Sequence, residues 1–285
     1  MSELLQDMKT WRFWRHYFVK CFAVLGTIVA SIRIWLLFFP QHSHILGGVG
    51  FILAMIASVA IAFVVTWPRP IECEYSSPET KVKIKKGDIF KQDEDHLVIG
   101  ICNTFDTKIP EIIEKKSLLG QAIDRLYGSD YERLDADLDG ALKSKTPIEP
   151  LTKPGKTVRY EIGTVAVIKN QARKLYLSAY SEMDMSNSAS SQIEGLTKSL
   201  FDLWTEVVAT GNCQPISITP WGGGPSRISS ILPAQDSIRL IILSFMFASR
   251  KKKVSDQLTI VVPPAVFKKL DRLELQAFLS SLRSS

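Results

Sequence analysis

Two long apolar runs before residue 70 constrain the fold of this chain more than any other feature of its sequence. Residues 21–39 carry a single charged side chain, that of Arg33, and residues 45–67 carry none. Each run is long enough to cross a hydrocarbon layer of ~30 Å as a helix of about 20 residues. The sequence therefore predicts a transmembrane α-hairpin over residues 21–67.

The flanks of the hairpin predict its orientation. Residues 1–20 carry four basic side chains interleaved with five aromatic ones, a composition that suits an amphipathic lead-in at the lipid headgroups. The loop between the runs has no Lys or Arg, whereas Arg69 follows the second run. Because basic residues favour the cytoplasmic side, both ends of the hairpin and everything after it are expected in the cytoplasm.

Alternatives remain open for the first run. It also has the length and position of a signal peptide, but no small-residue cleavage site follows it and a second apolar run comes at once. Arg33 lies six residues before Phe39, so it can either snorkel to the outer interface or line a pore. We favour a membrane span with a snorkelling Arg33.

Small residues recur at every fourth position of the second run, at Gly50, Ala54, Ser58 and Ala62. This spacing places them on one helix face, where they allow another helix to approach closely. Ala57 and Ala60 lie off this stripe, so a generally small membrane composition is the alternative. We interpret the stripe as a helix-packing surface.

The remainder of the chain is expected to form one soluble domain. Residues 68–79 are rich in Pro and Ser and predict an extended linker, so the domain spans residues 80–285. Six Lys or Arg and two acidic residues precede residue 70, which leaves only +2 of the net charge of +6 for the rest and argues against nucleic-acid binding. Four cysteines without paired spacing and four scattered histidines argue against a zinc site or disulfides, and for a reducing compartment.

Strand-like and helix-like patterns alternate through this domain, which predicts an α/β fold with a mixed sheet. Residues 82–84 alternate apolar and basic side chains, and residues 97–102 are apolar throughout, as a strand covered on both faces would be. The other expected strands are residues 158–168, 174–179, 216–219 and 258–262. The expected helices are residues 109–116, 117–127 with Ser117 as the cap, 130–143, 190–210, 237–248 and 265–282, and residues 147–155 are expected to form a surface loop.

Polar and glycine-rich segments follow the expected strands, where open α/β sheets bind their ligands. Glycines let backbone amides approach phosphate oxygens, and a helix start offers unpaired N–H donors. Each segment alone is a weak signal, but their order and placement predict a nucleotide-type pocket without a metal. The candidate ligand-binding residues are Asp88, Ile89, Phe90, Asn103, Thr104, Asp106, Thr107, Gly120, Gln121, Trp221, Gly222, Gly223 and Gly224.

These segments resemble those of macro domains, three-layer α/β/α modules that bind ADP-ribose, over about residues 80–284. The resemblance implies that Asp88 of Gly-Asp-Ile contacts the adenine amine and that Asn103 and Asp106 face the distal ribose. It also implies that Gly120-Gln121 and residues 222–224 hold the diphosphate. The chain departs from the family pattern in having Asn-Thr-Phe-Asp instead of paired asparagines and Trp-Gly-Gly-Gly-Pro in the phosphate loop.

The combination of the hairpin with these motifs looks like the membrane-anchored macro-domain effectors of bacterial Thoeris anti-phage defence systems. That resemblance implies a signal ligand rather than a cofactor: a modified ADP-ribose, histidine-conjugated in this effector type, made by a TIR-domain protein on infection. It further implies a multi-pass protein of the bacterial inner membrane that forms homo-oligomers. Oligomerisation would disrupt the membrane and cause growth arrest or cell death.

Two other functions remain open. One is a membrane-tethered ADP-ribosyl hydrolase, and the other is a tethered module with an inactive pocket. The sequence shows no Ser-His-Asp or Cys-His arrangement, and Asp88 and Asp106 fit hydrogen-bond acceptors for a ligand. Because hydrolysis through a bound water needs no nucleophilic side chain, the hydrolase stays as the alternative to a receptor without enzyme activity.

Overall fold

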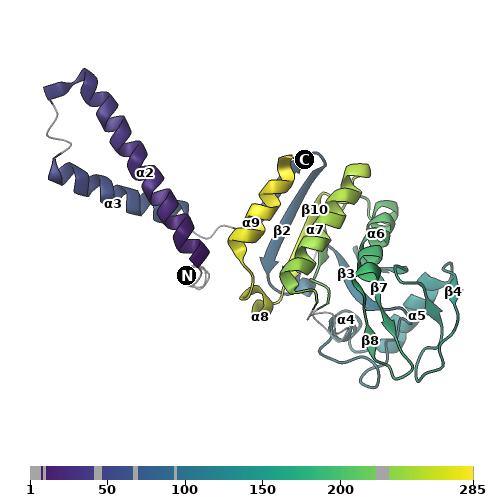
Figure 1. Cartoon of the computed structure of the whole chain (residues 1–285). Helices are drawn as coiled ribbons and strands as arrows, with labels where there is room; N and C mark the ends of the chain where they lie inside the picture. The colour runs from purple at the N-terminus through teal and green to yellow at the C-terminus, as the bar shows by residue number, and fades with distance from the viewer. Residues whose placement is uncertain are drawn as a thin grey trace. The chain divides into compact units, whose positions relative to one another are not determined.

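The computed structural model describes residues 8, 11–41, 47–66, 70–92, 95–222 and 231–284. Internal contacts divide the chain into two compact units. The first comprises Met1–Arg69 together with Asp271–Glu274, and the second comprises Pro70–Leu270 and Leu275–Ser285. Figure 1 shows the helical hairpin of the first unit and the α/β body of the second.

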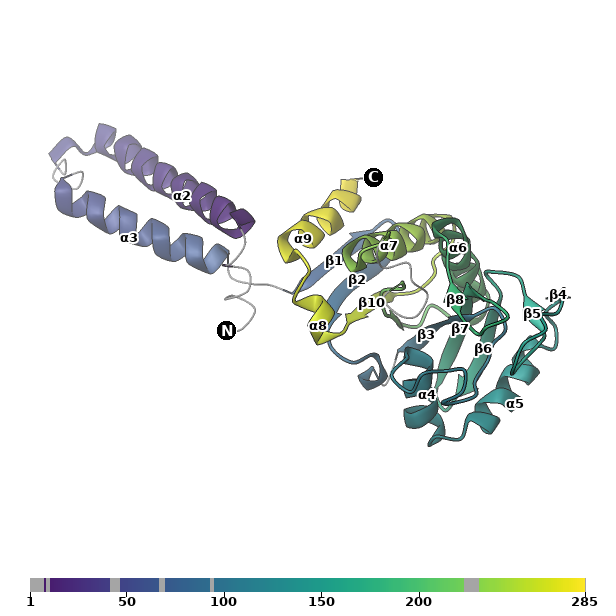
Figure 2. The ribbon, with the colours of Figure 1, turned by 60° about the horizontal axis from the view of Figure 1, so that its bottom comes forward.

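The hairpin consists of α2 (Trp11–Phe38) and α3 (Gly48–Val65), which pack side by side (Figure 2). Both helices are long and apolar enough to cross a membrane by length and composition. Helix α2 unites the predicted lead-in with the first apolar run, because no proline interrupts residues 11–38. Residues 42–44 of the predicted polar loop and residues 45–46 of the second run lie outside the described residues.

The buried residues of α3 are all small. Ala54, Ser58 and Ala62 are buried, and α2 is the helix that packs against α3. The Ser58 hydroxyl donates to the carbonyl oxygen of Ala54 at 2.7 Å, which satisfies it within its own helix. The small-residue stripe is thus a packing surface inside the hairpin.

The second unit is built on a mixed sheet in the order β1-β2-β10-β9-β3-β7-β6, with β8 paired to β7. The inner strands β2, β10, β9, β3 and β7 run parallel, and β1 and β6 lie antiparallel at the edges. A separate pair joins β4 to β5. The strands are β1 (Ile71–Ser76), β2 (Glu79–Lys86), β3 (His96–Cys102), β4 (Pro147–Ile148), β5 (Arg159–Tyr160), β6 (Val165–Asn170), β7 (Arg173–Met183), β8 (Ala189–Ser190), β9 (Ile216–Ile218) and β10 (Gln257–Val262).

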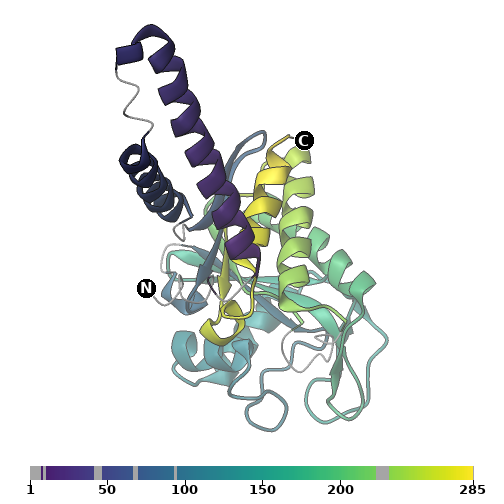
Figure 3. The ribbon, with the colours of Figure 1, turned by 60° about the vertical axis from the view of Figure 1, so that its left-hand side comes forward.

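Helices cover both faces of the sheet, which confirms the predicted three-layer α/β/α architecture (Figure 2). One core lies beneath α6 (Ile193–Thr210), α7 (Ala234–Lys251) and α9 (Arg272–Ser281), of which α7 and α9 lie side by side (Figures 1 and 3). The opposite core lies beneath α4 (Leu118–Tyr127) and α5 (Tyr131–Leu142). Short helical turns are η2 (Ile89–Lys91), α8 (Pro264–Phe267) and η3 (Leu282–Ser284).

The predicted linker over residues 68–79 is wrong for most of its length. Residues 71–76 form β1, with Ile71, Cys73 and Tyr75 buried in the first core. Their period-two alternation is a strand signal, and it outweighs the flanking prolines because Pro70 precedes the strand and Pro78 lies in the turn after it.

Two predicted helices also differ from the structure. Residues 109–116 form turns, because Pro110 lacks an N–H and the carbonyl of Lys108 accepts from both Ile112 and Ile113 instead of starting a regular helix. The closing helix divides into α8 and α9, because the Asp271 carboxylate accepts from Glu274 N–H at 3.0 Å and caps a new helix.

The segments on either side of residue 156 also differ from the prediction. Residues 147–155, predicted as a surface loop, contain β4 and the buried Lys153. The strand predicted over residues 158–168 divides into β5 and β6, because Gly163 adopts a φ of 100° between them.

Candidate functional site

The predicted ligand-binding segments follow strands that end at one edge of the sheet. Strands β2, β9 and β3 are all parallel to β10 or to each other, and they precede Asp88, Trp221 and Asn103, respectively. Strands β2 and β3 lie three positions apart in the order β2-β10-β9-β3. Neighbouring strands are about 4.8 Å apart, so the ends of β2 and β3 are roughly 14 Å apart. A ligand that contacted both Asp88 and Asn103 would have to be long and lie across the strand ends.

Asp88 caps the η2 turn and is held by an arginine. One carboxylate oxygen accepts from Phe90 N–H at 3.0 Å, and the other pairs with Arg125 of α4. Burial alone would raise the pKa of the Asp88 carboxyl, but the hydrogen bonds from Arg125 and Phe90 outweigh it and hold that pKa below its ordinary value. Ile89 and Phe90 are buried beneath this cap, and the Arg125 guanidinium lies over the Phe90 ring at 5.2 Å.

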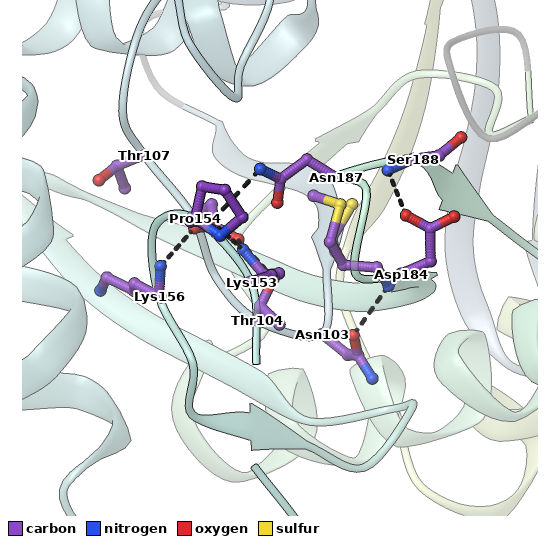
Figure 4. Close-up of polar contacts among 12 residues, drawn as sticks. Asn103, Thr104, Thr107, Lys153, Pro154, Lys156, Asp184, Asn187 and Ser188 are labelled. Carbon is purple, nitrogen blue, oxygen red and sulfur yellow. Dashed lines mark hydrogen bonds and ion pairs between the residues drawn. The ribbon is translucent and has the colours of Figure 1, made fainter. Parts of the chain in front are cut away.

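Asn103 connects three strands. Its side-chain amide donates to the carbonyl of Tyr160 at 3.2 Å. The amide oxygen accepts from Met183 N–H at 3.2 Å (Figure 4). Its backbone N–H donates to Ser181, and its carbonyl accepts from Tyr160. Asn103 is therefore a buried junction at the end of β3, not a side chain that projects freely towards a ligand.

Asp106 is the centre of a buried polar network. One oxygen accepts from Lys153 at 2.7 Å and from the Thr104 hydroxyl at 2.6 Å, and the other accepts from Lys156 N–H at 2.8 Å. The side chains of Asp106 and Lys153 are 1% and 0% exposed. Because all of these bonds are internal, Asp106 fixes residues 153–156 against the loop that follows β3.

The neighbouring contacts extend this network. The Thr107 hydroxyl donates to Asp135 of α5 at 2.9 Å, and Lys156 pairs with Asp135 and Asp139. Burial alone would lower the pKa of Lys156, but the two carboxylates outweigh it and raise that pKa. Figure 4 shows the three loops around Asn103, Pro154 and residues 184–188 meeting here, with the Asn187 amide donating to the Pro154 carbonyl at 3.3 Å.

Gly120 lies in the first turn of α4, as predicted. The Ser117 hydroxyl accepts its N–H at 3.0 Å, so the cap uses the donor that was expected for a phosphate. A Cβ at Gly120 would lie 2.9 Å from Lys115 Cα, which explains why glycine is needed there. The Gln121 side chain donates to the Lys116 carbonyl at 3.0 Å.

Trp221 opens the predicted phosphate loop after β9. Its ring is buried and stacks on Tyr180 of β7 with centroids 5.0 Å apart. A Cβ at Gly100 of β3 would lie 2.6 Å from the Tyr180 ring, so this glycine makes room for the stack. Gly222 has a φ of 91°, a conformation that favours glycine. Gly223 and Gly224 lie outside the described residues.

Three residues of this edge were not predicted from the sequence: Arg125, Lys153 and Tyr180. Each acts through a partner that is distant along the chain, and no local pattern marks such a pair. The Pro154-Gly155 turn is the nearest signal for Lys153, since it fixes the backbone beside it. In the part of the chain that the structure describes, no three His, Cys, Asp or Glu side chains gather as a metal site would need.

Comparisons with known proteins identify the fold and the family. Residues 82–263 match the family model described as Thoeris protein ThsA, Macro domain. Among proteins with curated functions, no sequence matches the chain significantly.

Solved macrodomains share the fold at low sequence identity. The Oceanobacillus iheyensis macrodomain with MES bound has a TM-score of 0.51 and 11% identity, over 75% of this chain and 100% of that chain. The same macrodomain with ADP has a TM-score of 0.50 and 10% identity, over 75% and 98%. A variant of it with ADPR has a TM-score of 0.50 and 12% identity, over 75% and 100%.

Proposed function

Because the chain belongs to the Thoeris ThsA macro-domain family, we propose that its α/β unit is the receptor for an ADP-ribose-derived signal. The match over residues 82–263 carries this proposal, since it includes the strands and loops of the candidate edge. The Oceanobacillus macrodomain structures hold ADP or ADPR, which fits a fold suited to such ligands.

The proposed ligand contacts lie in the loops that follow the carboxyl ends of β2, β9 and β3. Asp88 selects adenine by accepting from its amine, either beside Arg125 or after Arg125 turns away. The loop that begins at Trp221 and Gly222 holds the diphosphate, since residues with a φ such as that of Gly222 bring backbone amides close to an anion. Asn103 and Asp106 shape the distal end through the network around Lys153.

The signal is a modified ADP-ribose, histidine-conjugated, supplied by a TIR-domain protein. The two apolar helices anchor the receptor in the bacterial inner membrane with both termini in the cytoplasm. Binding of the signal drives homo-oligomerisation, and the assembled hairpins disrupt the membrane. Two helices are too few to enclose a pore, so several copies must cooperate.

Calorimetry on the full chain in lipid nanodiscs tests the receptor step. We expect ADP-ribose to bind and adenosine monophosphate to bind more weakly, because it lacks the second phosphate and the distal ribose. Asp88→Ala should weaken ADP-ribose binding by about 1–3 kcal/mol, since the adenine amine loses its acceptor. Unchanged affinity in that variant would remove Asp88 from the binding site.

Recovery of the ligand separates a receptor from a hydrolase. We expect histidine-conjugated ADP-ribose to be recovered intact after hours with the protein, because a receptor gains nothing by destroying its signal. Chromatography of the extracted ligand measures this. Free ADP-ribose that accumulates in proportion to protein concentration would show the hydrolase instead.

A further inference from the structure

A cavity of about 340 Å³ adjoins the η2 turn that Asp88 caps. Its lining side chains come from η2, from the end of α4 and from the turn between β6 and β7. They are Phe90, Lys91, Arg125, Leu126, Asn170, Gln171 and Arg173. Its volume falls in the range of small-molecule sites.

The register of the sheet separates this cavity from the ends of β3 and β9. Arg173 is the first residue of β7 and pairs with Asn170, whereas Leu175 pairs with Leu97 near the start of β3. The cavity therefore opens beside the amino ends of β3 and β7. The length of β3 places it roughly 20 Å from the loop that begins at Asn103.

The charges that line the cavity are of one sign. Among its described lining residues are three cations, Lys91, Arg125 and Arg173, and no carboxylate. Lys91 is exposed, and no ion pair is described for it. The amides of Asn170 and Gln171 add neutral polar groups to the wall.

Both arginines are held in place before any ligand arrives. The Arg173 guanidinium donates to the Gln92 carbonyl at 2.8 Å, and the Arg125 guanidinium pairs with Asp88 and lies over the Phe90 ring. A guanidinium presents a fork of donors that fits phosphate oxygens. Two fixed guanidinium groups and a free ammonium in one cavity are the donor set that a phosphate group requires.

We propose that this cavity is a binding site for a small phosphate-type anion, apart from the loops that follow β3 and β9. Arg125 links the two, because it lines the cavity and holds Asp88. An anion that pairs with Arg125 in the cavity competes with Asp88 for the guanidinium donors and leaves an oxygen of Asp88 available to the adenine amine. The anion therefore strengthens signal binding, a consequence that rests on the proposed role of Asp88.

Equilibrium dialysis of the full chain in nanodiscs against radiolabelled inorganic phosphate tests the site, with chloride holding the ionic strength constant. We expect saturable binding of one phosphate per chain. Arg173→Gln and Lys91→Gln should each weaken it about tenfold or more, the loss expected for a charge-assisted contact. Lys251→Gln, the same charge change on α7, should leave it unchanged. Lys91→Gln keeps the test valid if Arg173→Gln misfolds, because the Lys91 side chain makes no described hydrogen bond and its loss should not disturb the fold.

Three results would overturn the proposal: phosphate binding that is abolished by chloride, phosphate binding that is equal in Arg173→Gln and the parent chain, or phosphate that ADP-ribose displaces one for one.

For the link to Asp88, we expect saturating phosphate to lower the Kd of ADP-ribose several-fold in the parent chain and not in Arg173→Gln. A chain that bound phosphate but never ADP-ribose would refute the proposed receptor function and leave the anion site standing.

Discussion

At the scale of single residues, the buried pair between Asp106 and Lys153 is the most consequential feature. Two opposite charges with almost no exposure lie 2.7 Å apart, so each compensates the desolvation of the other. Gly155, with a φ of 88°, lets the backbone turn so that Lys156 N–H reaches the same carboxylate. The loop over residues 153–156 is thus fixed by charge and by backbone conformation together.

Removing one member of this pair should cost far more than removing both. We expect Lys153→Met to destabilise the fold by about 3–5 kcal/mol, because the Asp106 charge stays buried without its partner. The double variant Asp106→Asn, Lys153→Met should recover most of that loss, since the Asn oxygen still accepts from Lys156 N–H.

Denaturant unfolding of the full chain in detergent, followed by near-UV circular dichroism, measures both variants. Lys108→Met is the matched control, because its partner Glu111 is 3.8 Å away and both side chains are more than half exposed. It should cost no more than about 1 kcal/mol. A double variant that is less stable than Lys153→Met would show that the pair stabilises the fold beyond mutual neutralisation.

The lowered pKa of Asp88 predicts a pH dependence of stability. A carboxyl with a pKa lower in the folded than in the unfolded chain contributes stability above the unfolded value, near pH 4, and loses it as the pH falls through the folded value. We expect the parent chain to be more stable than Asp88→Asn at pH 7, with a difference that shrinks below about pH 4. Thermal unfolding at pH 7, 5 and 3 measures it, and a difference that stayed constant would show that Asp88 titrates normally.

At the scale of elements, the start of α4 shows how a glycine can serve packing. Alanine normally favours a helix over glycine by about 1 kcal/mol, but a Cβ at Gly120 would collide with the backbone of residues 114–115. We expect Gly120→Ala to destabilise the fold, because the turn before the helix must move. Gly140→Ala in α5 is the matched control, since a Cβ there meets nothing within 4 Å, and it should stabilise the fold by about 0.5–1 kcal/mol.

The midpoints of thermal unfolding compare these two glycine variants directly. Stabilisation by both would mean that residues 114–115 yield easily. Packing would then not require a glycine at position 120.

Elements with a strong local pattern could be predicted from the sequence. The apolar run of β3, the alternation in β2 and the Ser117 cap of α4 are set by neighbours within a few residues, and the structure confirms all three. Strand β1 was missed because the flanking prolines were weighed above its short period-two alternation, and its pairing with β2 is visible only in the sheet.

The candidate site was predicted less completely than the fold. The sequence predicted that the candidate loops follow strands that end at one edge, and the structure confirms that position. It did not show which of their side chains are already bonded. Asp106 and Lys153 are 47 residues apart, and Asp88 and Arg125 are 37 apart, so these contacts depend on tertiary structure alone.

At the scale of the whole molecule, the proposed function requires the α/β unit to pass a signal to the hairpin. A ligand shifts an equilibrium only if it binds one state more tightly than the other, so the assembled form must have the higher affinity for the signal. The hairpin must in turn be a well-packed unit that keeps its shape as copies meet. In α3 that packing rests on the buried Ala54, Ser58 and Ala62.

Replacing Ala54 and Ser58 with Leu should therefore uncouple signal binding from membrane damage. Both side chains are buried where α2 packs on α3, and larger ones would force the helices apart. We expect the double variant to bind histidine-conjugated ADP-ribose like the parent chain, because residues 70–270 are unchanged, but not to release dye from liposomes when that ligand is added.

The matched control is Ala57→Leu with Ala60→Leu, which makes the same change at positions that are not buried. This control should release dye like the parent chain, since Ala57 is only partly buried and Ala60 is exposed. Dye release from the Ala54, Ser58 variant at the parental rate would show that close packing within the hairpin is not needed for the output. Membrane damage would then have to depend on the aromatic and basic surface of α2, which the same assay can test by replacing Trp11 and Phe18, both at least half exposed.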